Sequence, residues 1–299
     1  MHPLSRDPLP LGKSGLSVSP LAWGMWRFAA ADVVTATRLV HAALDAGITF
    51  LDTAAIYGAD GPGFGAAEAL LGEVLRGDKG LRGRVMLATK GGIVPKVPYD
   101  SSAAHIAESV DASLQRLGVD EIDLWMVHRP DSLVHPAEVA GALDAAVASG
   151  KVRAVGVSNY TVSQVRALVA HLKAPLACNQ IEYSPLRLTP LTDGSLDLAE
   201  ELDFAIMAWS PLGGGRLGAP SGIWANAVAD ALDTVAQKHG VSRTGAAYAW
   251  IMAHPARPIP IVGSQGPERI AEAADAFKVQ WTRAEWYAVL TAAREEPLP

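Results

Sequence analysis

Short apolar runs alternate with longer amphipathic segments along almost the whole chain. Runs of this length, bounded by glycine or polar residues, are typical of strands buried in a parallel sheet. The pattern predicts eight such strands, at residues 20–24, 48–52, 85–90, 122–128, 152–158, 176–182, 205–210 and 260–263.

The amphipathic segments between these strands predict helices. They cover residues 32–46, 66–76, 102–117, 136–149, 162–171, 195–201 and 225–239, and two more follow the last strand at 267–276 and 283–294. Parallel strands with helical crossovers form an open sheet or a closed barrel, and a count of eight favours the barrel. We therefore expect one domain over residues 1–299, a (β/α)8 TIM barrel with an extra C-terminal helix.

Composition narrows the class of protein. Hydrophobic residues make up 49% of the chain and charged residues 19%, which supports a large core and argues against disorder. The net charge of −6 argues against a nucleic-acid groove, so any anionic ligand must be held by local cations. No cysteine and histidine cluster offers a metal site, and the single cysteine, Cys178, is expected to be a small buried hydrophobe. With neither a secretory signal nor a membrane-spanning stretch in the sequence, a cytoplasmic protein is expected.

Four polar side chains stand at or just beyond the carboxyl ends of predicted strands. Asp52, Lys90 and His128 end three strands, and Tyr57 lies in the turn after the first of them. Parallel β/α barrels place their active sites on the face where these strand ends meet. The four residues therefore predict one site for proton transfer.

Reduction of a carbonyl group needs a proton at oxygen as well as hydride at carbon. Tyr57 is the candidate acid, and an ammonium group at Lys90 is expected to lower its pKa from about 10. Asp52 would keep Lys90 charged, and His128 would hydrogen-bond the substrate oxygen. A lysine here also suits the Schiff-base chemistry of a barrel aldolase, but an anchoring carboxylate is a poor neighbour for an imine-forming lysine.

These motifs resemble those of the aldo-keto reductases. The segment Gly-Ile-Thr-Phe-Leu-Asp-Thr-Ala-Ala-Ile-Tyr-Gly at 47–58 is similar to the first family signature, and further matches follow in family order at 88–92, 123–128, 155–159, 179–184 and 263–264 with Arg269. Residues 128–131 and 208–215 look most like a bacterial oxidoreductase branch. The resemblance implies a TIM-barrel enzyme that reduces an aldehyde or ketone to an alcohol with NADPH, with Tyr57 as general acid.

The resemblance also implies where the cofactor lies, because no side chain can supply hydride. No glycine-rich fingerprint follows a strand, so a Rossmann site is not indicated. Ser158, Asn159 and Gln180 match family residues that hold the nicotinamide carboxamide, and Trp209 matches an aromatic that stacks on its ring. The residues expected along the pyrophosphate are Ser210, Leu212, Gly213, Gly214, Gly215 and Arg216.

The last β/α loop is expected to hold the adenosine end of the cofactor. Gly263 and Ser264 lead into a helix, where Arg269 can form a forked pair with a 2′-phosphate and Glu272 matches an adenine contact. Two residues depart from the family pattern. Gly263 replaces a lysine common in one branch, and Ala273 replaces an asparagine. NADP is the expected cofactor, with NAD as the alternative.

The expected partner is a small carbonyl compound, with Trp26 and Ile56 lining its pocket. The same residues support the reverse reaction, so a sugar or alcohol dehydrogenase is an alternative. A cofactor-binding redox sensor or regulatory subunit with little turnover is another. We expect a monomer or small homo-oligomer without a nucleic-acid or membrane partner.

Overall fold

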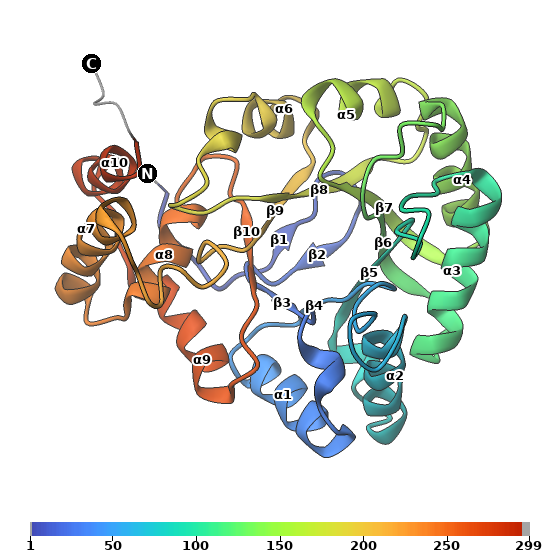
Figure 1. Cartoon of the computed structure of the whole chain (residues 1–299), viewed down its shortest axis with the longest axis horizontal. Coiled ribbons are helices and arrows are strands. Elements are labelled where there is room, and N and C mark those ends of the chain that lie inside the picture. Colours follow the sequence, from blue (N-terminus) through green and yellow to red (C-terminus); the bar gives the residue numbers. More distant parts are fainter. Residues whose placement is uncertain (1, 295–299) are drawn as a thin grey trace.

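A computed structural model describes residues 2–294 as a ring of strands surrounded by helices (Figure 1). Met1 and residues 295–299, which the predicted domain includes, lie outside the described residues. The strands pair in parallel around a closed barrel, so the predicted (β/α)8 TIM barrel is confirmed. In chain order they are β3 (Ala22–Gly24), β4 (Phe50–Asp52), β5 (Met86–Gly91), β6 (Ile122–Val127), β7 (Val152–Ser158), β8 (Leu176–Glu182), β9 (Ala205–Trp209) and β10 (Ile259–Val262).

The helices lie on the outside of the barrel and begin where the sequence supplies caps. The side chain of Asp32 accepts a hydrogen bond from the Thr35 amide at the start of the first, and Thr161 forms a capping box with Gln164 at another. The helices are α1 (Val33–Asp45), α2 (Ala66–Gly77), α3 (Ala103–Leu117), α4 (Pro136–Ala148), α5 (Val162–Val169), α6 (Ser195–Leu202), α9 (Pro267–Glu272) and the extra helix α10 (Arg283–Ala292).

Two helices, rather than the one predicted, connect β9 to β10. The first, α7 (Ile223–His239), corresponds to the predicted helix at 225–239, and α8 (Arg243–Met252) was not predicted. All residues of α8 from Gly245 to Met252 are buried, so the segment has no polar stripe to mark it as a helix. None of the described helices is both long and apolar enough to cross a bilayer.

A small antiparallel hairpin was also missed. Strands β1 (Leu9–Pro10) and β2 (Ser17–Val18) pair with each other outside the barrel sheet, and each is too short to show an alternating pattern. Leu11 and Leu16 are buried in the cluster that fills the barrel, which also contains Phe50 and Cys178. Burial raises the pKa of the Cys178 thiol, as fits a buried apolar residue.

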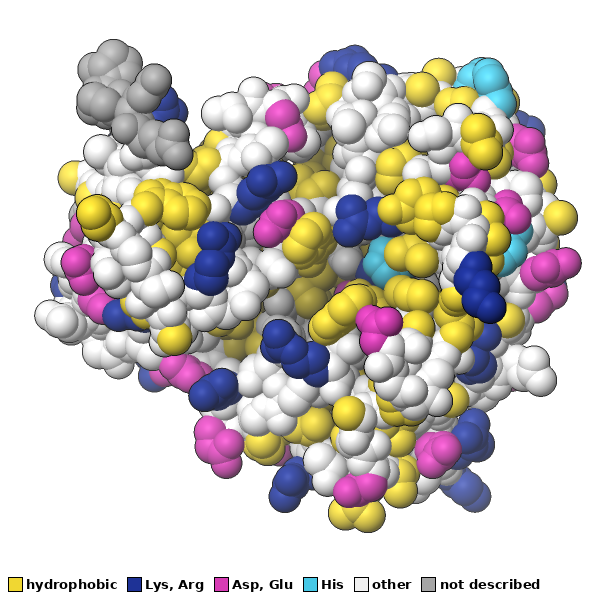
Figure 2. Space-filling model, in the orientation of Figure 1, with side chains coloured by type: hydrophobic (Ala, Val, Ile, Leu, Met, Phe, Trp, Pro, Cys, Tyr) yellow, Lys and Arg dark blue, Asp and Glu magenta, His cyan; other side chains and the backbone are white. Residues whose placement is uncertain are grey.

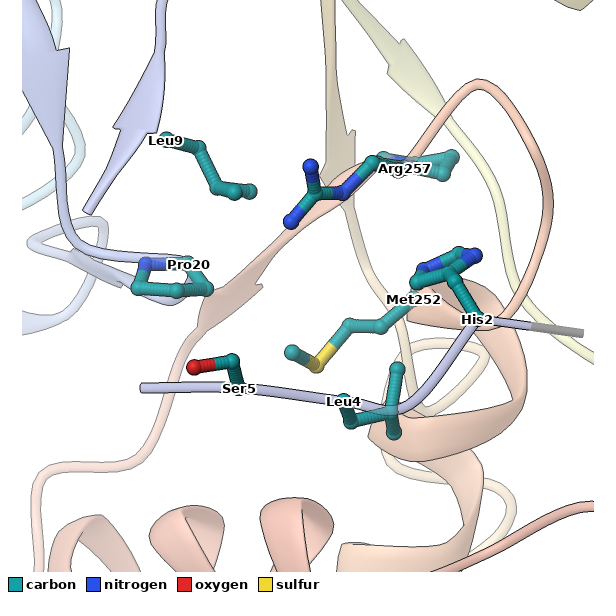
Figure 3. A pocket seen from close by; sticks show the side chains of 8 residues that line it. His2, Leu4, Ser5, Leu9, Pro20, Met252 and Arg257 are labelled. Carbon is teal, nitrogen blue, oxygen red and sulfur yellow. The ribbon is translucent and has the colours of Figure 1, made fainter. Parts of the chain in front are cut away.

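The N-terminal segment packs beside this hairpin. Figure 3 shows Leu4 and Ser5 facing Met252 and Arg257 across a narrow gap. The gap holds about 10 Å³, which is room for about one water molecule. It is therefore too small to be a ligand site.

Candidate active site

Strand register brings the four predicted polar residues to one face of the barrel. Asp52 pairs with Ala88, two residues before Lys90, and Lys90 pairs with Met126, two residues before His128. Figure 2 looks onto this face and shows a hollow at its centre with hydrophobic side chains and a histidine along one side. The carboxyl ends of β4, β5 and β6 therefore converge at that hollow.

Tyr57 reaches the same place through a tight turn after β4. Its amide donates to the carbonyl of Ala54 at 3.0 Å, and its side chain is buried. Gly58 follows with a φ of 103°, and a Cβ there would lie 2.8 Å from that of Ala66. Only glycine fits this turn without strain, so the sequence locally fixes where Tyr57 points.

Lys90 is fully buried and fully paired. Its ammonium donates to both carboxylate oxygens of Asp52, at 2.9 and 2.8 Å, and to the Thr53 carbonyl at 2.7 Å. The Nζ atom lies 5.0 Å from the centre of the Tyr57 ring. The sequence could not indicate the contact with the Thr53 carbonyl, because every residue type carries a backbone carbonyl.

Burial and charge act against each other on both groups. Burial lowers the pKa of Lys90, but Asp52 and Tyr57 together outweigh it, so the net pKa is raised and the group stays charged. Burial also raises the pKa of Tyr57, and the positive charge of Lys90 only partly opposes this. Lys90 lowers the pKa of Tyr57 as expected, but desolvation is the larger effect, so the net pKa is raised in the protein alone.

His128 lies beside Tyr57 as a neutral imidazole. The two ring centres are 5.9 Å apart, and the rings meet edge to face. Burial, then the charges of Lys90 and Arg129, hold the pKa of His128 well below 6.5. Its Nδ1 atom is buried without a hydrogen-bond partner in the described part of the chain. At neutral pH the ring can therefore exchange hydrogen bonds without carrying a charge.

The four residues predicted around the nicotinamide form one network at the ends of β7, β8 and β9. The Trp209 indole donates to Asn159 Oδ1 at 3.0 Å, and Asn159 Nδ2 donates to Ser158 Oγ at 2.8 Å. Ser158 Oγ donates in turn to the Gln180 carbonyl at 2.9 Å. The structure therefore brings together a half-buried aromatic and two amide side chains, which fits a flat ring bearing a carboxamide.

Gln180 also contacts the charged pair, which the sequence did not indicate. Its Nε2 donates to Asp52 Oδ1 at 2.9 Å, and the whole side chain is buried. The bond crosses the barrel from β8 to β4, so it depends on closure of the sheet and leaves no local sequence pattern. Gln180 thus links the predicted nicotinamide residues to Lys90 through Asp52.

The loop after β9 is held by its own hydrogen bonds. The amides of Gly213 and Gly215 donate to the carbonyls of Ser210 and Leu212, and Arg216 Nε donates to the Gly213 carbonyl at 2.9 Å. Three successive glycines take positive φ angles, with open space around Gly214. The Arg216 guanidinium lies over the Trp224 ring, 5.8 Å from its centre. The loop is exposed and its path depends on glycines, but most of its amides donate to carbonyls of the same loop.

The loop after β10 is tied to the first barrel strand. The Trp23 indole donates to the Ser264 carbonyl at 2.9 Å, and the Ser264 hydroxyl accepts from the Gly266 amide. Arg269 lies in the short helix α9 with an exposed side chain, and Glu272 ends that helix. The structure leaves Arg269 accessible from solvent beside the barrel mouth.

The two predicted pocket residues differ in placement. Trp26 is 59% exposed, and its ring meets the Tyr57 ring edge to face, with centres 5.1 Å apart. Ile56 is half-buried and packs against the outer hydrophobic core. Trp26 therefore stands over the acid candidate, whereas Ile56 mainly supports the turn.

A second hollow lies elsewhere, on the outer flank between the loop after β8 and α10. It holds about 710 Å³, and its lining includes Leu188, Trp286 and Tyr287. None of the residues singled out for chemistry lines it. The active site is therefore identified by the geometry of the buried charged pair rather than by this hollow.

The fold and the geometry of this site indicate the class of protein to which the chain belongs. The model of the aldo/keto reductase family matches residues 20–293, and the chain belongs to that family. It is an oxidoreductase, and its family generally uses nicotinamide cofactors.

Named relatives are found over nearly the full length. A 6-dehydroglucose reductase of Novosphingobium aromaticivorans is 60% identical over 99% of this chain and 100% of its own. A protein of the same name from Agrobacterium fabrum is 41% identical over 93% of this chain and 95% of its own. Among solved structures, a glycerol dehydrogenase from Gluconobacter oxydans superposes with a TM-score of 0.86 at 26% identity, covering 99% of this chain and 98% of its own.

Proposed function

We propose that the chain reduces the aldehyde group of a sugar-type compound to an alcohol with NADPH, and that Tyr57 donates the proton. The observation that carries this proposal is the fully buried Lys90, which Asp52 and the Thr53 carbonyl hold against Tyr57. A buried charge so fully paired is costly to assemble, and sites of this kind occur where proton transfer needs a fixed field.

Tyr57 performs the proton half of the reaction. With its pKa raised, the hydroxyl is protonated at neutral pH and can donate to a carbonyl oxygen. As it loses the proton, the growing phenolate charge faces the Lys90 ammonium 5.0 Å from the ring centre. Lys90 therefore stabilises the product of proton transfer more than the starting state, which is what accelerates a reaction.

His128 orients the carbonyl oxygen. Because its imidazole is neutral, it can donate one hydrogen bond without competing with Tyr57 for the proton. Its edge-to-face contact with Tyr57 places both groups on one side of the hollow. An oxygen bound between them receives donors from two directions.

The cofactor is assigned to the network of Ser158, Asn159, Gln180 and Trp209, with the loop residues Ser210, Leu212, Gly213, Gly214 and Arg216 beyond it. When bound, the nicotinamide supplies the hydride that no side chain can. Trp209 would stack on the nicotinamide ring, and Asn159 takes a positive φ of 61° and bonds both Trp209 and Ser158. The preorganised amides keep that end of the site rigid.

The substrate class rests on relatives and on the shape of the rim. Two relatives at 60% and 41% identity are named for reduction of a dehydroglucose. Trp26 presents an exposed ring beside Tyr57, and such rings pack well on the carbon faces of sugars. The reverse reaction is the second candidate, since the similar solved structure is named a glycerol dehydrogenase.

The choice of NADPH rests on Arg269, with Gly263, Ser264 and Glu272 shaping the rest of that end. Arg269→Ala should raise the Kd for NADPH about 10- to 100-fold, the range expected for loss of a charge-assisted forked pair. The Kd for NADH should change little. Fluorescence titration with both nucleotides measures this, with Arg283→Ala on α10 as the matched control. Equal weakening of both nucleotides would contradict the role of Arg269.

A further inference from the structure

Arg129 is a cation at the barrel mouth that has no partner in the described part of the chain. It follows His128 directly after β6, and its side chain is half-buried. No ion pair or hydrogen bond joins its guanidinium to any residue within 2–294. A guanidinium stays charged at all ordinary pH values, so a half-buried one without a partner is expected to meet an acceptor from outside the chain.

The nearest carboxylate along the chain is already engaged. Asp131 Oδ1 accepts from the Leu133 amide and Oδ2 from the Ser101 amide, both at 2.9 Å. Asp52, the carboxylate inside the site, is bound by Lys90 and Gln180. Among residues 2–294, no carboxylate forms an ion pair with Arg129.

The positive charge of Arg129 acts on Tyr57 and His128, the two groups proposed to contact the carbonyl oxygen. After the larger effects of burial and of Lys90, it lowers the pKa of His128, and it acts in the same direction on Tyr57. Figure 2 shows cationic side chains around the central hollow. An acceptor bound by Arg129 would thus lie close to the atoms on which Tyr57 and His128 act.

The position of Arg129 favours substrate over cofactor. The residues assigned to the nicotinamide are on β7, β8 and β9, and those assigned to its phosphates follow β9 and β10. Arg129 instead follows His128 directly after β6, and its positive charge acts on both Tyr57 and His128. It therefore lies on the side of Tyr57 and His128, where the carbonyl compound must sit.

We propose that Arg129 is a specificity-determining residue that binds an acceptor oxygen of the substrate, a hydroxyl or carboxylate carried next to the reacting carbonyl. The pocket then selects oxygen-rich carbonyl compounds, such as sugar aldehydes and oxo acids, over alkyl aldehydes. This inference rests on the proposed reductase function and specifies its substrate class.

Three aldehydes of similar size test the inference: glyceraldehyde with hydroxyls, glyoxylate with a carboxylate, and propanal with neither. Initial rates with NADPH are measured for the wild type, Arg129→Met and Arg129→Lys. We expect Arg129→Met to raise KM for glyceraldehyde and glyoxylate about 10- to 100-fold, as for loss of a charge-assisted hydrogen bond, and to lower kcat less. The kcat/KM ratio of each oxygenated aldehyde to propanal should fall accordingly.

The two oxygenated aldehydes distinguish the acceptors. Arg129→Lys keeps a point charge but loses the planar fork, so it should retain more activity on glyoxylate than on glyceraldehyde. Arg38→Met, which removes an exposed charge on α1, controls for net charge and should leave all ratios at the wild-type value. Unchanged ratios in Arg129→Met would overturn the proposal.

Binding separates this inference from the proposed function. If the wild type turns over none of the three aldehydes, the reductase proposal fails. Calorimetry with glycolate, which carries both a hydroxyl and a carboxylate, then decides the role of Arg129. Tighter binding to the wild type than to Arg129→Met supports it, and equal or absent binding to both contradicts it.

Discussion

Lys90 keeps its charge in a fully buried position because three acceptor contacts replace its water. Burial also acts on Tyr57 and raises its pKa, although the Lys90 ammonium lies beside it. Burial holds His128 neutral in the same way. The charge state of each residue is therefore set by a balance between desolvation and one close partner, which residue type alone does not reveal.

This balance predicts the pH profile of carbonyl reduction. His128 titrates well below pH 6.5, so kcat/KM should show no inflection between pH 6 and 8. Reduction needs protonated Tyr57 and falls as pH rises through its pKa, which is raised, so the decline should begin only above about pH 10. Steady-state rates with NADPH across this range check both limits.

The outcome that contradicts this account is an acid limb near pH 6.5. His128→Asn keeps a neutral donor and should lower the rate without creating or removing an inflection in that window. An inflection near 6.5 that disappears in His128→Asn would show that the imidazole titrates in its ordinary range.

The sequence was sufficient to identify Asp52, Tyr57, Lys90 and His128 as neighbours, because parallel strand ends must share a face. It could not predict the bond from Gln180 to Asp52, which spans the barrel. Nor could it predict a role for Arg129, which simply follows His128 in the chain. That Arg129 has no partner among the described residues depends on the folded structure and leaves no pattern in the sequence.

Helix α2 anchors the strand that carries Lys90. Glu68 on α2 is fully buried, and its Oε1 accepts from Thr89 Oγ1 at 2.5 Å, directly before Lys90. Its Oε2 accepts from Arg116 Nε on α3 at 2.6 Å. One carboxylate therefore holds two helices and the active-site strand together.

Glu68→Ala should lower the free energy of unfolding by about 3 kcal/mol, because it leaves Arg116 and Thr89 without their acceptor and opens a cavity. Glu73→Ala, an exposed glutamate on the same helix, should change it by less than about 0.5 kcal/mol. Denaturant unfolding of both variants makes the comparison. Similar stabilities for the two would contradict the anchoring role.

The elements that the sequence predicted well are those with one apolar face. Helices α1 and α3 were located within one residue, because their buried residues recur at helical spacing and Asp32 and Ser102 cap them. Helix α8 was not predicted for the opposite reason, since its burial on all sides removes the periodic pattern of apolar and polar residues. Strand β4 is two residues shorter at its start than predicted, because the buried Ile48 extends the apolar run into the preceding loop.

The two ends of the barrel have different roles, one contributing to stability and the other carrying the candidate active site. The hairpin contributes Leu11, Leu16 and Val18 to the interior cluster, whereas the charged pair lies at the carboxyl ends of the strands. The count of eight strands predicted barrel closure, but nothing in the pattern indicated the hairpin. Barrels of this kind commonly use one end for stability and the other for activity.

Leu11→Ala should therefore lower the free energy of unfolding by about 2–5 kcal/mol while leaving kcat/KM unchanged under conditions where the protein is folded. Leu133→Ala is the matched control, because Leu133 is 95% exposed and its loss should be nearly neutral for stability. Thermal unfolding and initial rates are measured on the same samples. A parallel loss of kcat/KM in Leu11→Ala would show that the two ends are coupled.

The role of Tyr57 as the proton donor in carbonyl reduction is tested by single-turnover reduction by Tyr57→Phe with NADPH bound. Tyr183→Phe is the control, because that buried hydroxyl has no hydrogen-bond partner within the described chain. We expect Tyr57→Phe to keep NADPH affinity within about threefold and to lose about 10²–10⁴-fold in rate, the usual contribution of a general acid. Tyr183→Phe should match the wild type. A Tyr57→Phe variant that binds NADPH and reduces the aldehyde at the wild-type rate would contradict the account.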